Sequence, residues 1–276
     1  MFRRILTYKN KIPVLIKKIS NYLSLFSANM VSLIARMNRI FEKYDVKMTY
    51  FISTYLIENQ PTFFSHFGDH DYGPHGHTHP DYSLIGRKAA FKDMREAISV
   101  FKKFNQNPWI FRAPYGITRI EKNSDLFFEY EKKLGILYDT SINIQKPPWK
   151  EPPHPIKHKS GVITLPLIGV SDDVLIDNLG LNNNNVILRH FVEALDYGRT
   201  GVLVYDLHPI RMGQVKYVEI LEGFIKIINK KKNFMILSLK EAFSKFYKKD
   251  KEETIVCLSG DIDNLSILDY FRRLKT

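Results

Sequence analysis

The chain has 276 residues, of which 44% are hydrophobic and 25% charged, and this balance excludes an intrinsically disordered or collagen-like protein. A single cysteine, Cys257, excludes a disulfide framework and every multi-cysteine zinc or iron–sulfur site, so a metal would have to be held by histidines and carboxylates. The net charge of +12 favours anionic surroundings, but no arginine–aromatic pattern of a nucleic-acid module accompanies it, and we expect no specific nucleic-acid partner.

The first 29 residues predict a helical extension. Apolar residues recur there at helical spacing, at Ile16, Ile19, Leu23 and Phe26, with lysines nearby. This face suits packing on the protein's own core, and it is also compatible with a peripheral membrane contact. No apolar run reaches the roughly 18 residues of a membrane-spanning helix, and no clear cleavage site follows. We therefore expect no transmembrane segment and a cytoplasmic location, which the lone cysteine also favours.

From residue 30 onward, short apolar runs rich in β-branched and aromatic residues alternate with longer helix-periodic segments. Strands are predicted at 47–52, 70–73, 109–112, 136–139, 162–167, 202–207, 234–239 and 255–259, and helices at 30–44, 87–104, 125–134, 186–197 and 215–229. Alternation of this kind is typical of an α/β fold with a parallel sheet and helical crossovers. Because the rhythm is unbroken, we expect a single irregular (β/α) barrel of seven or eight strands over residues 30–276. The proline-rich stretch 143–159 is expected to be a surface loop near its rim.

Three pairs of histidines stand four residues apart, and one of them is a candidate metal site. These pairs are His66/His70, His75/His79 and His154/His158. On a helical turn this spacing would bring two imidazoles to one side, where both could reach an ion at about 2.1 Å. Pro155 and Gly68 argue against a helix in the other two pairs. His75 and His79 directly follow a predicted strand and are the favoured ligands.

Other polar residues also fall at the ends of predicted strands. Arg112, Asp139 and His208 each end or follow one strand, and Asp261 and Asp263 follow the last. In a parallel barrel the carboxyl ends of all strands open on one face, where active sites are built. A structural role explains any one of these residues, but it explains the whole set less easily. We therefore expect them to meet the histidine pair at one rim.

In this order the segments resemble the motifs of polysaccharide deacetylases, the NodB-homology group of carbohydrate esterases, of the family 4 type. The resemblance spans about residues 30–242 and rests on KMTYFI at 47–52, HGHTHPD at 75–81, FRAPYG at 111–116, YDTS at 138–141 and LHP at 207–209. It implies an irregular β/α barrel and the metal-dependent hydrolysis of N-acetyl groups, usually on N-acetylglucosamine units. The implied partner is a carbohydrate substrate, while the oligomeric state stays open.

One departure from the family pattern concerns its first motif, a strand that ends in an aspartate pair. The expected stretch at 23–29 reads LSLFSAN and contains no carboxylate, whereas the C-terminus reads CLSGDID at 257–263. Because the first and last strands of a barrel are neighbours, we hypothesise a circular permutation in which residues 254–276 supply the first strand and its Asp-x-Asp motif. The rival explanations are a truncated second repeat, a strand exchanged with another subunit and a coincidental surface pair.

The resemblance implies a role for each candidate. His75, His79 and Asp263 would bind Zn²⁺ or another divalent transition metal, Asp261 would be the base, and His208 would protonate the departing amine. The backbone N–H of Tyr115 would stabilise the oxyanion. Arg112 would pair with Asp261, and Asp139 would balance Arg112 or support His208.

Three further features of the sequence lie near these motifs. His77 should point away from the metal, the acid pair at 172–173 suits a loop turn better than a substrate contact, and Trp149 is the better of two candidates for stacking on a sugar. Two other functions stay open. One is a catalytically inactive glycan- or metal-binding protein, and the other is a basic protein that associates with nucleic acid or membrane.

Overall fold

The computed structural model describes residues 29–117, 124–248, 250 and 252–265. The predicted N-terminal extension, up to residue 28, and the end of the relocated segment, from residue 266, lie outside the described residues. Within the described residues, no helix has both the length and the apolar character needed to cross a membrane.

A parallel sheet forms one half of the barrel, and its longest strand comes from the C-terminus. The strand β9 (Thr254–Ile262) pairs with β1 (Thr49–Ile52), β7 (Val202–Asp206) and the short β8 (Phe234–Ile236), and β1 pairs in turn with β2 (Asp71–Pro74). All nine residues of β9 are buried, as expected for a parallel strand that is covered on both faces. The strand from the C-terminus therefore occupies the place next to β1 that the sequence predicts for it.

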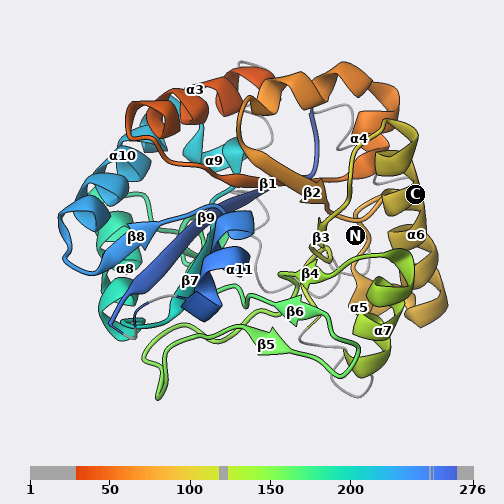
Figure 1. Ribbon diagram of the computed structural model, residues 1–276. Helices are drawn as coiled ribbons and strands as arrows, with labels where there is room; N and C mark the ends of the chain where they lie inside the picture. Colours follow the sequence, from red (N-terminus) through yellow and green to blue (C-terminus); the bar gives the residue numbers. More distant parts are fainter. Residues whose placement is uncertain (1–28, 118–123, 249, 251, 266–276) are drawn as a thin grey trace.

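The other half of the barrel consists of shorter strands. β3 (Ile110–Phe111), β4 (Tyr138–Asp139) and β6 (Ile163–Thr164) run parallel, and β5 (Ile156–Lys157) pairs antiparallel with β6. The two sheets are joined where Arg112 N donates to Pro74 O at 3.3 Å and Ile168 N donates to Val204 O at 3.1 Å. The described strands thus follow one another around an irregular barrel in the order β9, β1, β2, β3, β4, β6, β7, as Figure 1 shows.

Helices cover the outside of the barrel at nearly the predicted positions. The long ones are α3 (Met30–Lys43), α6 (Arg87–Lys103), α7 (Ser124–Leu134), α8 (Asn184–Tyr197) and α10 (Val215–Lys230). In α3, Asn29 caps the first turn by accepting a hydrogen bond from Ser32 N, and Leu33, Met37 and Phe41 form a buried stripe at helical spacing. The shorter elements are α4 (Thr54–Asn59), α5 (Tyr82–Ile85), α9 (Pro209–Met212), α11 (Leu239–Lys245), the 3₁₀ turns η2 (Pro61–Phe67) and η5 (Phe246–Lys248) and the π-helical turn η4 (Asp173–Asn178).

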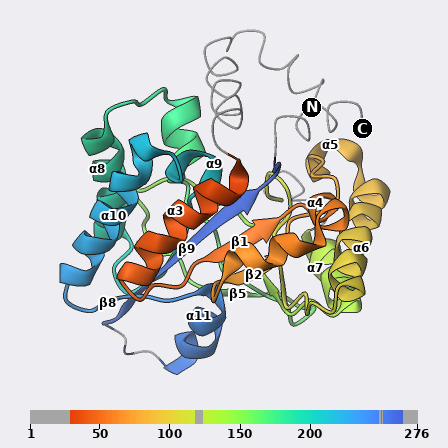
Figure 2. The ribbon, with the colours of Figure 1, turned by 90° about the horizontal axis from the view of Figure 1, so that it is seen from above.

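The helix α11 closes the end of the barrel at which the strands begin. Leu239 and Phe243 pack with Phe51, Ile110 and Cys257 in the barrel interior, and the backbone N–H of Leu239 donates to the hydroxyl of Thr49 at the start of β1 (3.3 Å). Figure 2 shows α11 at the end opposite the tip of β9. The carboxyl ends of the strands are therefore the end at which a site can be built.

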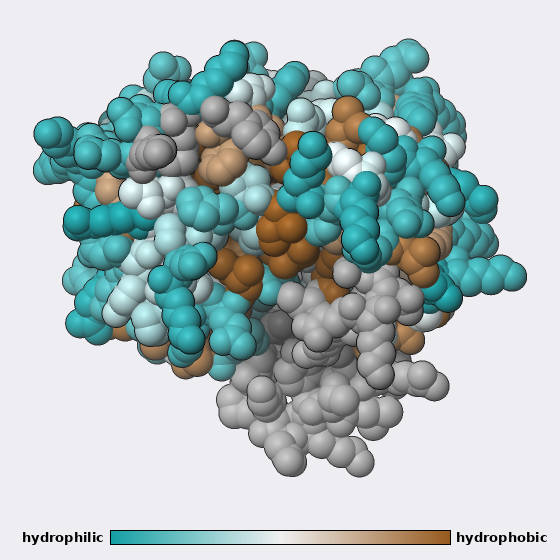
Figure 3. Space-filling view, turned by 60° about the horizontal axis from the view of Figure 1, so that its bottom comes forward, coloured by the Kyte–Doolittle hydropathy of each residue, from teal (hydrophilic) through white to brown (hydrophobic). Residues whose placement is uncertain are grey.

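The structure adds one strand to the predicted elements and shortens several others. β5 lies inside the proline-rich stretch that was predicted to be a loop, and it pairs with β6 through two exposed residues. β3, β4 and β6 have two residues each where the sequence predicts four to six. On the face drawn in Figure 3, the described surface is mostly hydrophilic, with a hydrophobic patch near the centre of the view.

Candidate active site

Two histidines and an aspartate meet where β2 and β9 end on either side of β1. His79 Nε2 lies 3.0 Å from Asp263 Oδ1, and His75 Nε2 lies 3.8 Å from the same oxygen. The two Nε2 atoms are 3.1 Å apart. His75 directly follows β2, while Asp263 directly follows β9. The structure thus brings together the three residues that the sequence proposes as metal ligands.

The segment between the two histidines is a loop and not the helical turn that the spacing suggested. Gly76 and His79 both have positive φ, at 68° and 57°, which a regular right-handed helix does not contain. Backbone N–H groups at the start of α4 bind this loop, because Thr54 N donates to Gly76 O and Tyr55 N donates to His77 O. The two imidazoles therefore converge through a left-handed loop conformation.

Asp93, a buried residue of α6, organises this loop. Its carboxylate accepts hydrogen bonds from His77 N at 2.8 Å, from Thr78 N and Thr78 Oγ1 at 2.9 Å, and from Tyr82 Oη at 2.9 Å. A Cβ at Gly76 would lie 2.8 Å from this carboxylate and 2.9 Å from a ring carbon of Pro114. Glycine is therefore required at this position, both by the close packing and by the positive φ.

The hydrogen bonding of His75 fixes which ring nitrogen faces the site. His75 Nδ1 donates to the backbone carbonyl of Arg112 at 2.9 Å, since a carbonyl oxygen only accepts. Burial lowers the pKa of His75 to about 4, so the ring is neutral at pH 7 and Nε2 carries a lone pair. That nitrogen lies 3.2 Å from Asp261 Oδ2 and 3.8 Å from Asp263 Oδ1. A lone pair that faces carboxylates is unfavourable unless a cation lies between them.

The donor set fits a divalent transition metal. Three ligands held at roughly 2.1 Å from one zinc ion in tetrahedral geometry stand about 3.4 Å apart, and the three separations here run from 3.0 to 3.8 Å. Two imidazole nitrogens and one carboxylate also form a common ligand set of catalytic zinc. His75, His79 and Asp263 therefore could hold such an ion.

Arg112 and Asp261 form a buried ion pair, as predicted. Arg112 Nη1 donates to Asp261 Oδ1 at 2.7 Å and to Asp206 Oδ1 at 3.0 Å, and Nη2 donates to Ser259 Oγ at 2.6 Å. The guanidinium also stacks over the ring of Phe51, 4.0 Å from its centroid. Burial raises the pKa of Asp261, and the positive charge of Arg112 opposes that rise.

His208 is held by an aspartate other than the predicted one. Its Nδ1 donates to Asp172 Oδ1 at 2.6 Å, and its backbone N–H donates to Asp172 Oδ2 at 2.8 Å. The other ring nitrogen lies 3.6 Å from Asp206 Oδ2 and 4.0 Å from Asp261 Oδ2. Burial alone would lower the pKa of His208, but Asp206 and Asp172 outweigh burial and raise it well above the ordinary value.

Asp139 belongs to a hydrogen-bond network in the wall of the barrel. The prediction that it balances Arg112 or supports His208 is therefore wrong. Its carboxylate accepts hydrogen bonds from Ser141 N, Ser141 Oγ and Thr164 Oγ1. It faces the fully buried Glu131 of α7, and burial raises the pKa of both carboxyl groups. Asp139 ends β4, and in the barrel order β6 separates that strand from β7, which leads to His208.

Three other residues were singled out in the sequence, and the structure gives the contacts of each. The Tyr115 ring packs against the ring of His79 with centroids 4.8 Å apart, and its φ is 62°. His77 Nδ1 lies 3.0 Å from the hydroxyl of Thr54, away from the three candidate ligands. Trp149 Nε1 donates to Gln145 O at 2.7 Å, and its ring is half-buried against the core.

Asp172, Asp206 and Asp93 are functional candidates whose roles the sequence analysis missed. The sequence analysis predicts a loop turn at Asp172, although this acid follows the predicted strand at 162–167 and so meets the same strand-end criterion as the other candidates. Asp206 stands two residues before His208 at the end of β7. No sequence signal distinguishes Asp93, which lies on the buried face of a long helix.

Comparisons with known proteins agree with the fold described above. Residues 23–138, less than half of the chain, match the polysaccharide deacetylase family, while a search of curated proteins finds no match. A crystal structure of a "probable Polysaccharide deacetylase" from Pseudomonas aeruginosa PAO1 aligns with a TM-score of 0.60 and 21% identity, covering 77% of this chain and 70% of that one. The Puue allantoinase gives 0.60 and 19% over the same shares. The Xyl-CE4 domain of a xylanase from the hindgut metagenome of Trinervitermes trinervoides gives 0.50 and 15%, covering 81% and 89%. At these identities the structures show a shared fold.

Proposed function

We propose that this chain, which resembles the polysaccharide deacetylases in sequence over residues 23–138 and in its barrel fold, is a metal-dependent hydrolase that removes N-acetyl groups from an N-acetylated sugar or polysaccharide. The proposal depends on one observation above all. His75 Nε2 lies 3.2 Å from a carboxylate oxygen of Asp261 and 3.8 Å from one of Asp263, and His79 Nε2 lies 3.0 Å from the same oxygen of Asp263. A cation held by His75, His79 and Asp263 resolves this arrangement.

In the proposed reaction Asp261 acts as the base. A divalent cation supplies the Lewis acidity that makes a water acidic and polarises the acetamide carbonyl. Asp261 accepts the proton of the attacking water, and its raised pKa makes it a stronger base than an exposed carboxylate. Arg112 keeps this carboxylate ionised and oriented through the 2.7 Å hydrogen bond. Arg112 also forms an ion pair with Asp206, which neutralises part of the positive charge of the guanidinium.

His208 acts as the acid in the same proposal. Its raised pKa keeps the imidazole protonated near pH 7, and Asp172 fixes its orientation through Nδ1, so that Nε2 faces the side of Asp261. His208 then gives its proton to the departing amine when the carbon–nitrogen bond breaks. The ring of Tyr115 packs against the ring of His79. The backbone N–H of Tyr115 is the proposed hydrogen-bond donor to the oxyanion.

The experiment that tests this function combines metal binding with acetate release. Wild type and Asp263→Ala are stripped with a chelator and titrated with Zn²⁺. Acetate release is assayed on N-acetylglucosamine oligomers, and hydrolytic ring opening is assayed on allantoin, because the fold also resembles an allantoinase. We expect Asp263→Ala to lose metal affinity and acetate release together, while Asp125→Ala, at an exposed site on α7, changes neither. If Asp263→Ala binds zinc as tightly as wild type, Asp263 is not a ligand. If the wild type binds metal or glycan but releases no acetate, the inactive binding protein is the better description.

We also propose that the position of β9 reflects a circular permutation. Strand β9 supplies Asp261, and the residue directly after it is Asp263, at the place beside β1 that the first family motif would occupy. A rearranged chain that carries residues 252–265 in front of residue 29, and ends at residue 248, should fold and bind zinc as the wild type does. A rearranged chain that folds but fails to bind zinc would contradict the permutation.

A further inference from the structure

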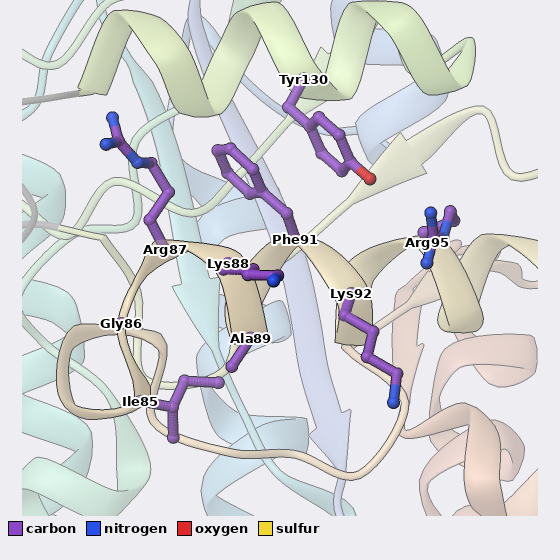
Figure 4. A pocket seen from close by; sticks show the side chains of 9 residues that line it. All are labelled: Ile85, Gly86, Arg87, Lys88, Ala89, Phe91, Lys92, Arg95 and Tyr130. Carbon is purple, nitrogen blue, oxygen red and sulfur yellow. The ribbon is translucent and has the colours of Figure 1, made fainter.

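A cavity lined partly by basic side chains lies on the outer surface where α5 meets α6. It has a volume of about 770 Å³ and is formed by the start of α6, the end of α5 and a side chain from α7. Figure 4 shows the nine side chains and backbone positions that line it. The short helix α5 begins three residues after His79. The cavity is therefore close in the chain to the candidate active site but separate from it.

Positive charge surrounds this cavity. Arg87, Lys88, Lys92 and Arg95 are all exposed, and the last three follow one face of α6 at helical spacing. Glu96 contacts Lys92 at 3.8 Å and offsets part of this charge. The patch as a whole stays positive, in keeping with the net charge of +12 for the whole chain.

The cavity floor and its edge are apolar. The rings of Phe91 and Tyr130 stack with their centroids 4.2 Å apart and an angle of 7° between their planes. Ile85 of α5 also lines the cavity and is 39% exposed, and Leu84, its neighbour in the chain, is 44% exposed. In Figure 2, α5 lies toward the end of the barrel at which β9 finishes, away from α11. Apolar and basic side chains thus occur together near the rim of the candidate site.

We propose that this surface docks the protein on an anionic lipid membrane. The α5–α6 patch consists of Leu84, Ile85, Arg87, Lys88, Lys92 and Arg95. Exposed aliphatic side chains gain free energy when they enter the boundary between headgroups and acyl chains, and basic side chains around them attract anionic headgroups. A soluble anionic glycan would explain the four cations, but the two aliphatic side chains gain more free energy at the acyl-chain boundary of a membrane than on the largely polar surface of a sugar. Docking in this way goes beyond the proposed hydrolysis and does not depend on it.

Vesicle sedimentation with the full chain tests the proposal. The probes are phosphatidylcholine vesicles with and without phosphatidylglycerol, and one variant combines Leu84→Ser with Ile85→Ser. A second variant combines Lys88→Gln, Lys92→Gln and Arg95→Gln. The matched control combines Leu137→Ser and Ile156→Ser, because these residues have the same exposure, 44% and 39%, outside the patch. Circular dichroism verifies that each variant is folded.

We expect wild type to bind only the vesicles that contain phosphatidylglycerol, and more weakly at high salt. The triple variant should bind more weakly by roughly fivefold for each basic side chain removed. The aliphatic variant should bind more weakly than wild type, and the control should bind like wild type. Equal binding by all four proteins would overturn the proposal, as would equal binding to both vesicles. Lysine-dependent binding to polygalacturonate without binding to vesicles would also overturn it and would identify a glycan surface. Acetate release from a soluble substrate is assayed in parallel, so failure of docking is distinguished from failure of the proposed hydrolysis.

Discussion

Replacement of Asp93 tests whether hydrogen bonds to its carboxylate fix the loop between the candidate ligands. Its carboxylate accepts four hydrogen bonds, two of them from the backbone N–H groups of His77 and Thr78. Each buried donor left without an acceptor costs about 1–3 kcal/mol. In Asp93→Ala the Tyr82 hydroxyl loses its acceptor inside the core, while the loop donors are half-buried and can reach water. We therefore expect a loss of about 1–3 kcal/mol in the free energy of unfolding.

The same substitution should weaken metal binding. Groups that orient metal ligands typically contribute 10–100-fold to metal affinity, and Asp93 fixes the loop on which both imidazoles converge. Asp93→Asn keeps one acceptor oxygen but turns an NH₂ group toward donors, so we expect roughly tenfold weaker zinc binding in a protein that still folds. Tyr82→Phe is the matched control, because it removes one of the four hydrogen bonds and leaves those of the loop in place.

Two measurements separate stability from metal positioning. Urea unfolding of the chelator-treated proteins gives the change in the free energy of unfolding, and competition with a chromophoric chelator gives the zinc affinity. The d–d spectrum of the Co²⁺-substituted protein reports ligand geometry directly. If Asp93→Asn is folded, binds zinc within twofold of wild type and gives an unchanged Co²⁺ spectrum, the loop does not need this support and the reasoning is refuted.

Three further substitutions test other contacts of the site. Asp172→Asn removes a negative charge that raises the pKa of His208, so the alkaline limb of the acetate-release profile should move to lower pH, and an unmoved limb would contradict the assignment. Because that raised pKa belongs to the folded state, the charged imidazole stabilises wild type below pH 6.5, and this stabilisation is lost as the pH rises through the folded-state pKa. Urea unfolding at a series of pH values should show this loss of stability in wild type. The loss should be smaller in Asp172→Asn. Arg112→Met leaves Asp261 buried without its partner, and we expect about 3–5 kcal/mol lower stability by urea unfolding together with an acid limb at higher pH. Gly260→Ala would push a methyl group against a neighbouring backbone carbonyl oxygen, and thermal unfolding should show a loss of roughly 1–3 kcal/mol.

The helices could be predicted from the sequence because each buries one face at helical spacing. The structure places α3 at Met30–Lys43 and α6 at Arg87–Lys103, within one residue of the predicted ends. The positions of the strands could be predicted from the sequence, but their lengths could not. β4 and β6 each pair over two residues, because the lengths of their ladders depend on how the barrel closes. Apolar runs do not contain that information.

The candidate ligands could be predicted because the carboxyl ends of parallel strands share one rim. The contacts among the site residues could not be predicted, because they depend on which strands are neighbours and on how far each side chain reaches. Asp172 follows β6 and His208 follows β7, and these strands adjoin. Arg112 follows β3 but reaches Asp261 on β9 across the barrel. Spacing alone also gave the wrong reason for the convergence of the two histidines, because it could not reveal the left-handed loop.

The alternation of side chains along β9 explains why its two acids are separated by one residue. In a strand, every second side chain points to the same face. Val256, Leu258 and Ile262 pack under the outer helices, whereas Ile255 and Cys257 face the barrel interior.

Ser259, Asp261 and Asp263 continue the inner row of β9. Ser259 and Asp261 contact Arg112, and Asp263 contacts His79 just beyond the end of the strand. The same row thus builds the core at one end of the strand and the candidate site at the other. A one-residue shift of β9 against β1 would turn every member of this row to the opposite face. The parallel register that pairs Phe51 with Asp261 therefore determines both the packing of the barrel and the assembly of the candidate site.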